Sequence, residues 1–467
     1  MGNRNINKVT VIGSGIMGSG IACHFANIGK EVLLLDIIPN ELSDIEINKN
    51  LTLEDKVVKN RIVNDSLVKA IKSKPSPLYH KNFKTRIETG NLIDDIHKIS
   101  EADWIIEVVI ENLEIKNQVF SEIEKHRKPG TIITSNTSGI PIKFMNSDRT
   151  EDFQKHFAVT HFFNPPRYLK LFEIIPGPNC KDEVIEFLKL FGEKFLGKTS
   201  VLGKDTPGFI GNRIGNFGIQ DLFHNIKELD ISVEDLDMLT GPLIGRPKSA
   251  TFRTADLVGI DTLCRVSDGI YENCPEDECR NVFVATDFLK DMLEKNWLGD
   301  KTGQGFYKKT RDKNGKREIL VLDIKSMEYR KMSKTKFDIV GKAKAIENTL
   351  ERFKFLISGD DKISEFYRKT LAGLFSYAQN RIPEISDDIY SIDDAVKAGF
   401  GWENGPFEVW NFIGVQEGID LMKSYNKKPA KWVEELVNSD NNGFYNIKNG
   451  FTYYYDIYEK KHLIKPG

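Results

Sequence analysis

A histidine and a glutamate in the segment 161–173 have the spacing of a general base and its partner. Two apolar runs flank a Pro-Pro turn there, a pattern that predicts a β-hairpin. If the hairpin folds about Arg167, His161 lies opposite Glu173, with Cβ atoms about 5 Å apart. The carboxylate would orient the imidazole, and the other ring nitrogen could take a hydroxyl proton as hydride leaves the carbon. A buried structural hydrogen bond would have the same spacing, so spacing alone leaves both interpretations open.

The glycine-rich turn Gly13-Ser14-Gly15-Ile16-Met17-Gly18 is a second candidate site, between an apolar run and helix-forming sequence. Gly13 permits a tight turn, Gly15 lets the backbone approach a pyrophosphate, and Gly18 allows close helix packing. Asp36 ends the next apolar run, where a carboxylate accepts hydrogen bonds from ribose hydroxyls and repels a 2′-phosphate. The pattern predicts NAD as cofactor rather than NADP. The alternative is a glycine-rich turn in an ordinary α/β unit.

Other polar residues follow predicted strands, at the edge where open α/β sheets bind ligands. Ser138 follows the run 131–134, and Glu111 and Lys116 follow the run 104–109. Asn212 lies five residues inside a helix that a proline opens. Taken singly, Ser138 could equally be a helix cap and Asn212 a packing amide.

The elements that must position these residues predict an α/β fold. Apolar runs alternate with helical segments from residue 8 to about 204, which is typical of a parallel sheet flanked by helices. We therefore expect a Rossmann-type NAD-binding domain over 1–204, with a helical insertion at about 50–86. The expected strands are 9–12, 32–35, 104–109, 131–134, 158–163, 171–175 and 200–202.

The remainder of the chain reads as helical and contains a weak repeat. The segments 252–260 and 407–415 resemble one another. Each follows an acidic segment that begins with a serine, and each precedes a Gly-Phe-Tyr triplet. We expect two all-α domains, over 205–310 and 346–467, joined by a linker over 311–345. Two copies are too few for a solenoid.

Composition excludes several classes of protein. Among 467 residues, 66 Lys and Arg against 68 Asp and Glu leave a net charge of −2, which argues against nucleic-acid binding by bulk charge. No apolar run approaches the roughly 18 residues of a membrane span, so no membrane association is expected. Five dispersed cysteines predict neither a disulfide framework nor a zinc site, so we expect no metal and a cytoplasmic location.

The insertion is strongly basic. Residues 56–86 hold nine Lys and Arg and one acid, Asp65. Such a segment near a cofactor cleft would attract phosphate groups, and Lys69, Lys72 and Lys74 are the favoured contacts. The alternative is a solvated helix face.

The chain resembles the 3-hydroxyacyl-CoA dehydrogenase family of fatty-acid β-oxidation. The resemblance rests on six motifs in the family's order and spacing: GSGIMG at 13–18, ENLEIK at 111–116, SNTS at 135–138, HFFNP at 161–165, TPGFIGNR at 206–213 and GFY at 305–307. Simple members end after one helical domain. The second copy resembles the dehydrogenase part of multifunctional β-oxidation proteins, in which a crotonase-like enoyl-CoA hydratase is fused.

The resemblance implies a role for each motif. His161 would be the catalytic base with Glu173 as its partner, and Ser138 and Asn212 would hold the substrate's 3-oxygen. Three further positions are implied at the same site, where Asn164 lines it and Glu111 and Lys116 lie near the nicotinamide ribose. Ser138 and Asn164 would thus serve both cofactor and substrate, and the basic insertion would contact CoA.

The implied reaction is the NAD-dependent oxidation of an (S)-3-hydroxyacyl-CoA to a 3-ketoacyl-CoA. The second helical copy could fill the space that a partner subunit's helical domain fills in short dimeric members, and homo-oligomers remain open. One alternative is another NAD-dependent β-hydroxyacid dehydrogenase, such as the 6-phosphogluconate type, which uses a lysine as acid and base. Another is a non-catalytic NAD-binding protein.

Overall fold

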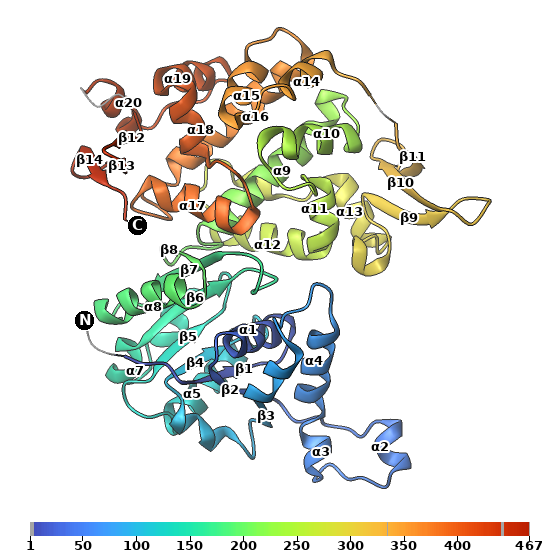
Figure 1. Ribbon diagram of the computed structural model, residues 1–467, viewed down its shortest axis with the longest axis vertical. Helices are drawn as coiled ribbons and strands as arrows, with labels where there is room; N and C mark the ends of the chain where they lie inside the picture. Colours follow the sequence, from blue (N-terminus) through green and yellow to red (C-terminus); the bar gives the residue numbers. More distant parts are fainter. Residues whose placement is uncertain (1–3, 334, 440–442, 467) are drawn as a thin grey trace. The chain divides into compact units, whose positions relative to one another are not determined.

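The computed structural model describes residues 4–333, 335–439 and 443–466, apart from the side chains of 227–229. The chain divides into two units, Met1–Thr206 and Pro207–Gly467 (Figure 1). The boundary expected at residue 204 lies two residues from this division.

An eight-stranded sheet forms the centre of the first unit, in the order β3-β2-β1-β4-β5-β6-β7-β8. Neighbouring strands are parallel except for the antiparallel pair β6 and β7. The order turns back on itself at β1 and β4, which is the point where doubly wound sheets bind nucleotides. The strands are β1 (Lys8–Ile12), β2 (Glu31–Asp36), β3 (Ile87–Asn91), β4 (Trp104–Glu107), β5 (Ile132–Ser135), β6 (Phe157–Phe162), β7 (Leu171–Pro176) and β8 (Thr199–Leu202).

All seven strands expected from the sequence are present, and β3 is the strand of this sheet that the sequence analysis missed. Its sequence, Ile-Glu-Thr-Gly-Asn, has a single large apolar residue and an interior glycine, so it lacks the apolar run of a buried strand. It lies at the edge of the sheet, where it pairs only with β2.

Helices cover both faces of this sheet. Alternate strand residues such as Val9 and Val11 share one core cluster with apolar side chains of α1, α4 and α8. On the other face, Phe120 of α5, Phe153 of α7 and Phe157 of β6 pack against one another with ring centroids 5.3 to 5.9 Å apart. The helices are α1 (Ile16–Asn27), α2 (Asp44–Asn48), α3 (Lys56–Lys59), α4 (Arg61–Lys72), α5 (Leu113–His126), α6 (Lys143–Asn146), α7 (Glu151–Lys155) and α8 (Asp182–Lys194).

The second unit is mainly helical. Its helices are α9 (Gly211–Leu229), α10 (Val233–Thr240), α11 (Phe252–Val258), α12 (Ile260–Asn273), α13 (Asp287–Glu294), α14 (Asp338–Ala343), α15 (Thr349–Ile357), α16 (Lys362–Asn380), α17 (Ile389–Phe400), α18 (Pro406–Ile413), α19 (Val415–Ser424) and α20 (Lys431–Val437). The long helices α16 and α17 both pack against α9.

The expectation of all-α domains is incomplete, because this unit also contains two antiparallel sheets. The first has the order β11-β10-β9 and the second the order β12-β13-β14. Their strands are β9 (Tyr307–Arg311), β10 (Arg317–Asp323), β11 (Glu328–Lys331), β12 (Tyr445–Lys448), β13 (Phe451–Asp456) and β14 (Lys461–Ile464).

The segment 311–345, assigned to a linker from its basic composition, is instead structured. It contains β10, β11 and α14. The apolar side chains of Val321 and Leu322 in β10 are fully buried, so this strand packs into the unit. Basic residues on its exposed positions hid that apolar core from the sequence analysis.

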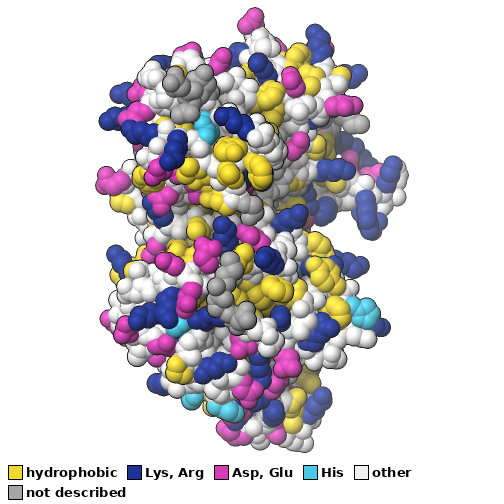
Figure 2. All heavy atoms as spheres, turned by 60° about the vertical axis from the view of Figure 1, so that its left-hand side comes forward, with side chains coloured by type: hydrophobic (Ala, Val, Ile, Leu, Met, Phe, Trp, Pro, Cys, Tyr) yellow, Lys and Arg dark blue, Asp and Glu magenta, His cyan; other side chains and the backbone are white. Residues whose placement is uncertain are grey.

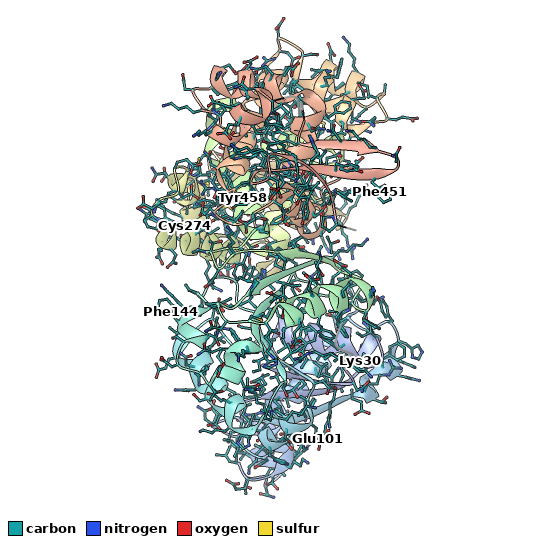
Figure 3. All side chains as sticks on the ribbon, turned by 90° about the vertical axis from the view of Figure 1, so that its left-hand side faces the viewer. Lys30, Glu101, Phe144, Cys274, Phe451 and Tyr458 are labelled. Atoms are coloured by element: carbon teal, nitrogen blue, oxygen red, sulfur yellow. The ribbon has the colours of Figure 1, made fainter. Side chains whose placement is uncertain are left out.

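The surface mixes charges of both signs. On the face drawn in Figure 2, Lys and Arg side chains are interspersed with Asp and Glu, as the small net charge suggests. Single apolar side chains such as Phe144 and Phe451 are more than half exposed (Figure 3). Within the described residues, no helix has the length and apolar character needed to cross a membrane.

Candidate active site

The hairpin of β6 and β7 brings His161 and Glu173 together. The two residues are direct partners in the antiparallel register, which confirms the predicted hairpin. Nδ1 of His161 lies 2.6 Å from Oε2 of Glu173, and their side chains are 9% and 0% exposed. Because the carboxylate holds the Nδ1 side of the ring, the opposite nitrogen, Nε2, is the one that can act as a base.

The other candidate residues of the first unit lie at the same sheet edge. Strands β1, β2, β4, β5 and β6 are parallel, so their carboxyl ends meet there. Gly13 follows β1, Asp36 ends β2, Ser138 follows β5 and His161 is the penultimate residue of β6. Because β6 is three strands from β1, His161 lies about 14 Å across the edge from the glycine-rich turn.

The glycine-rich turn has the form of a phosphate cradle. Gly13 has a φ of +101°, and a Cβ there would lie 2.5 Å from the Val108 carbonyl oxygen. A Cβ on Gly18 would lie 1.8 Å from the Gly13 oxygen, so both positions require glycine. At Gly15, by contrast, a Cβ would meet no described atom within 4 Å. That space, in front of the start of α1, is where a side chain would obstruct a pyrophosphate, and the residues therefore fit a dinucleotide.

Two side chains at the start of α1 complete the turn. Ile16 is 76% exposed and Met17 is half-buried against the core. The backbone N–H groups of this first turn point toward the space that Gly15 leaves open.

Asp36 is placed to receive a ribose. Its Oδ2 accepts hydrogen bonds from the Ser14 N–H at 2.6 Å and the Ser14 hydroxyl at 2.5 Å, and its Oδ1 accepts from the Ile37 N–H. These bonds fix the carboxylate beside the glycine-rich turn, where an acidic side chain accepts hydrogen bonds from the ribose hydroxyls in this kind of site.

Glu111 links the ends of β4 and β5. Its Oε1 accepts hydrogen bonds from the Thr137 hydroxyl and from the Ser138 N–H, the latter at 3.1 Å. The Ser138 backbone is therefore fixed, and the residue itself is half-buried.

Lys116 lies deeper than the sequence suggested. Its Nζ donates to both carboxylate oxygens of Glu107, at 2.8 and 3.0 Å, and lies 3.3 Å from Glu111. The Lys116 side chain is 1% exposed and that of Glu107 is fully buried. Glu107 also accepts from the Ser135 hydroxyl at 2.5 Å. Through this buried ion pair, Lys116 holds Glu107 and Glu111 in place at the carboxyl end of β4.

Sequence reasoning missed Glu107. The signal was present, because an acidic residue interrupts the apolar run 104–109 where β4 ends. A carboxylate in such a run requires a buried partner, which Lys116 supplies.

The loop between β6 and β7 carries Asn164, which is exposed. Lys198 supports this loop from below, since its Nζ donates to the carbonyl oxygens of Pro166 and Leu169. Burial lowers the pKa of Lys198 to about 8. Arg167 ties the loop to the basic insertion through hydrogen bonds to the carbonyls of Ser76 and Leu78.

The three candidate lysines are exposed. Lys69 and Lys72 lie in the last turn of α4, and Lys74 follows it. The structure thus ties the segment after them to the hairpin loop, while the lysines themselves face solvent.

Asn212 belongs to the second unit, in the first turn of α9, where it is half-buried. It is therefore not among the residues that the first unit brings together.

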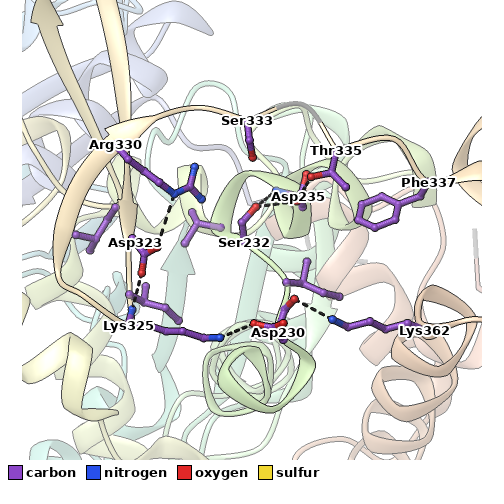
Figure 4. A pocket seen from close by; sticks show the side chains of 14 residues that line it. Asp230, Ser232, Asp235, Asp323, Lys325, Arg330, Ser333, Thr335, Phe337 and Lys362 are labelled. Atoms are coloured by element: carbon purple, nitrogen blue, oxygen red, sulfur yellow. Dashed lines mark hydrogen bonds and ion pairs between the residues drawn. The ribbon is translucent and has the colours of Figure 1, made fainter.

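The hollow drawn in Figure 4 contains none of the candidate residues. This cavity of about 370 Å³ lies in the second unit between α10 and the β10–β11 turn. Its charged groups pair with one another, as Lys325 does with Asp230 and Arg330 with Asp323. We find no chemistry there comparable to that of the hairpin.

One group of possible metal ligands occurs among the described residues, formed by Asp277, Glu278 and Cys279. Both carboxylates pair with arginines, Asp277 with Arg213 and Glu278 with Arg381. Burial raises the pKa of the Cys279 thiol to about 12.

Comparison with known proteins shows to which family the chain belongs. Residues 8–206 match the family model of the 3-hydroxyacyl-CoA dehydrogenase NAD binding domain, and residues 208–309 match that of the 3-hydroxyacyl-CoA dehydrogenase C-terminal domain. A probable 3-hydroxyacyl-CoA dehydrogenase of Deinococcus radiodurans is 41% identical over 67% of this chain and 85% of its own length. The chain belongs to the 3-hydroxyacyl-CoA dehydrogenase family.

Longer members of the 3-hydroxyacyl-CoA dehydrogenase family match more of the chain. A probable 3-hydroxyacyl-CoA dehydrogenase of Bacillus subtilis is 45% identical over 97% of this chain and 57% of its own length. A putative fatty acid oxidation complex trifunctional enzyme of Rickettsia prowazekii is 34% identical over 89% of this chain and 54% of its own length. The chain thus spans somewhat more than half the length of these two relatives.

The fold is also that of the family. The crystal structure of 3-hydroxybutyryl-CoA dehydrogenase from Escherichia coli superimposes with a TM-score of 0.63, at 22% identity, over 92% of this chain and 98% of that chain. At this identity the match shows the fold alone, and it includes much of the segment beyond residue 309 that the family models leave unmatched.

Proposed function

We propose that this chain catalyses the reversible, NAD-dependent oxidation of an (S)-3-hydroxyacyl-CoA to a 3-ketoacyl-CoA. The observation that carries the proposal is the buried His161–Glu173 pair at the sheet edge that also bears the glycine-rich turn. A general base beside a dinucleotide site is the arrangement that oxidation of an alcohol requires.

His161 is the base of this reaction. Its Nε2 takes the proton of the substrate's 3-hydroxyl, while Glu173 holds Nδ1–H and stabilises the imidazolium that forms. The low exposure of both side chains strengthens their interaction, because little water screens it. NAD, when bound, accepts the hydride from carbon 3 of the substrate.

Two polar side chains hold the substrate's 3-oxygen in this proposal. The Ser138 hydroxyl lies next to a backbone N–H that Glu111 fixes. Asn212 supplies the second donor from the first turn of α9. Asn164, Glu111 and Lys116 complete the proposed surroundings of the nicotinamide, with Lys116 acting through its buried partner Glu107.

The CoA phosphates bind the basic insertion in this proposal. Lys69, Lys72 and Lys74 present exposed ammonium groups, and the segment after them is tied to the hairpin loop by Arg167. Phosphate binding by such side chains weakens as ionic strength rises.

Matching hydrogen bonds in two parts of the second unit support a duplicated helical domain. We propose the division 1–204, 205–310 and 346–467, with 311–345 between the two copies. Asp237 accepts backbone N–H bonds from Phe252 and Arg253 at 2.7 and 3.0 Å and the Tyr307 hydroxyl at 2.7 Å.

The second copy repeats this arrangement. Asp393 accepts from the N–H groups of Phe407 and Glu408 at 2.9 and 3.0 Å and from the Tyr445 hydroxyl at 2.8 Å. The correspondence of Asp with Asp, Phe with Phe and Tyr with Tyr supports a common origin of the two copies.

We further propose that the chain works with an enoyl-CoA hydratase, fused or docked. The trifunctional name of a relative and the share of that relative's length that the chain spans both support this pairing. We also propose a cytoplasmic location, which the dispersed, free cysteines support. Homo-oligomers are compatible with the proposal.

The test is NADH formation from (S)-3-hydroxybutyryl-CoA and NAD, measured beside a longer acyl chain. We expect turnover with the wild type and its near-complete loss in His161→Ala, with NAD binding retained. NAD binding without turnover on either substrate would favour a non-catalytic NAD-binding protein and overturn the proposal.

A further inference from the structure

The first turn of α9, which carries Asn212, is held by a buried ion cluster that the second helical copy completes. Arg213 is 0% exposed, and its Nη2 lies 2.9 Å from Asp277 and 2.6 Å from Glu384. Its Nε donates to the Tyr377 hydroxyl at 2.9 Å. Tyr377 lies on α16 and Glu384 follows that helix, so two of these three side-chain partners of Arg213 come from the second copy.

Tyr377 is the central member of this cluster. Its hydroxyl donates to Asp277 at 2.8 Å while it accepts from Arg213, and its ring stacks on Phe217 of α9 at 3.9 Å between centroids. Burial raises the pKa of this phenol, so the hydroxyl keeps the proton that it donates to Asp277 at neutral pH. Arg381 closes the cluster with ion pairs to Asp277 and Glu384 at 2.8 and 2.9 Å.

The backbone before Asn212 has a costly conformation that Arg213 helps to hold in place. Gly208 and Phe209 both have positive φ angles, +76° and +47°, and Phe209 is not glycine. A non-glycine residue in the left-handed region is retained only where its surroundings hold it. Arg213 does so, because its N–H donates to the Gly208 carbonyl at 3.2 Å and its Nη1 donates to that of Pro207 at 3.4 Å.

We infer that Tyr377, Arg381 and Glu384 are positioning residues for Asn212, acting through Arg213. The inference rests on the proposed role of Asn212 in holding the substrate's 3-oxygen. It gives the second copy, which lies beyond the residues matched by the family model, a part in the reaction. Asn212 must keep its place because small displacements of an oxygen-binding donor lower turnover steeply.

The variant Tyr377→Phe tests this inference while keeping the ring that stacks on Phe217. We expect kcat with (S)-3-hydroxybutyryl-CoA to fall about tenfold, with KM for NAD unchanged, because only the hydroxyl that orients Arg213 is lost. The matched control is Tyr367→Phe on the same helix, whose buried hydroxyl donates to the Leu239 carbonyl at 2.7 Å, away from Arg213. The control should leave kcat within about twofold of the wild type.

A double-mutant cycle separates positioning from general loss of stability. In the Asn212→Ala background, Tyr377→Phe should change kcat by less than about twofold, because the residue that it positions is gone. An additive loss in that background, an equal loss in Tyr367→Phe, or no loss in Tyr377→Phe would each overturn the inference.

Amide hydrogen exchange supplies a readout that does not need turnover. Tyr377→Phe should speed exchange in a peptide covering residues 207–216 and leave the peptides of unit Met1–Thr206 unchanged. Unchanged exchange at 207–216 would also overturn the inference. If instead Asn212→Ala alone keeps full activity while exchange responds as expected, the proposed role of Asn212 fails and the structural coupling stands.

Discussion

At the scale of single residues, the proposed chemistry depends on carboxylates held in fixed positions. Glu173 is fully buried against His161, and Glu107 is fully buried against Lys116. A buried carboxylate without such a partner would be strongly destabilising. Each pair therefore contributes to the stability of the fold as well as to the proposed chemistry. Substitutions of single carboxylates at the site should change different kinetic quantities.

Glu173→Gln should lower kcat by about 10³-fold. The amide keeps the shape of the carboxylate but loses the charge that stabilises the imidazolium and selects the tautomer. Steady-state kinetics with saturating NAD measures the effect. Glu183→Gln, an exposed position on α8, is the control and should be silent. A loss below about tenfold in Glu173→Gln would contradict a catalytic pair.

Asp36→Ala should weaken the preference for NAD over NADP. The carboxylate beside Ser14 is the group expected to accept the ribose hydroxyls and repel a 2′-phosphate. We expect KM for NAD to rise about tenfold or more and the ratio of kcat/KM values between the two cofactors to fall, with little change in Tm. An unchanged ratio would show that Asp36 does not select the cofactor.

At the scale of elements, the sequence analysis predicted the strands of the first unit that have apolar runs. It missed β3, an edge strand without such a run. The run Trp-Ile-Ile before Glu107 marked β4, and the symmetric runs about Arg167 set the register of the hairpin. Strand β3 has no such run and exists because β2 offers it a free edge. The burial of Lys116 against Glu107 depends on tertiary packing, which local patterns do not encode.

Among the ion pairs that hold the segment 311–345 to the rest of the second unit, the pair of Arg330 with Glu234 has a clear pH dependence. Arg330 of β11 and Ser333 both donate to Glu234 of α10, whose side chain is 3% exposed. Burial would raise the pKa of Glu234, but these hydrogen bonds outweigh it and lower the pKa to about 2. A carboxyl with a lowered folded-state pKa contributes stability above its unfolded pKa, near 4.5, and loses it as pH falls toward 2.

Glu234→Gln should therefore lower the free energy of unfolding of the second unit at pH 7 by up to about 3 kcal/mol. The difference between variant and wild type should shrink as the pH approaches 2. Urea denaturation at several pH values measures it, and Glu328→Gln, an exposed residue of β11, is the control. A difference that is independent of pH would contradict the assigned ion pair.

At the scale of the whole molecule, the two proposed helical copies lie in one compact unit, and each contains a Tyr–Asp hydrogen bond of the same kind. Tyr307 braces the first copy through Asp237, and Tyr445 braces the second through Asp393. Because α9 packs against both α16 and α17, loss of either brace should reach the entire unit.

Tyr307→Phe and Tyr445→Phe should each lower the free energy of unfolding by about 1–2 kcal/mol. Each variant removes one hydroxyl donor from a carboxylate that keeps its backbone N–H partners. Denaturation of Pro207–Gly467 should remain a single transition in both variants. Tyr458→Phe, on an exposed turn, is the control. Two separated transitions would show that the copies unfold independently.

The cluster around Arg213 has an evolutionary consequence. In a symmetric dimer, every substitution appears on both sides of the interface, so a residue that suits one role must tolerate its mirror image. Here Arg213 on α9 and Tyr377 on α16 belong to different proposed copies within one polypeptide. The second copy can therefore accumulate changes that tune the first without being inherited by it, and the two halves are free to diverge into a reacting half and a supporting half.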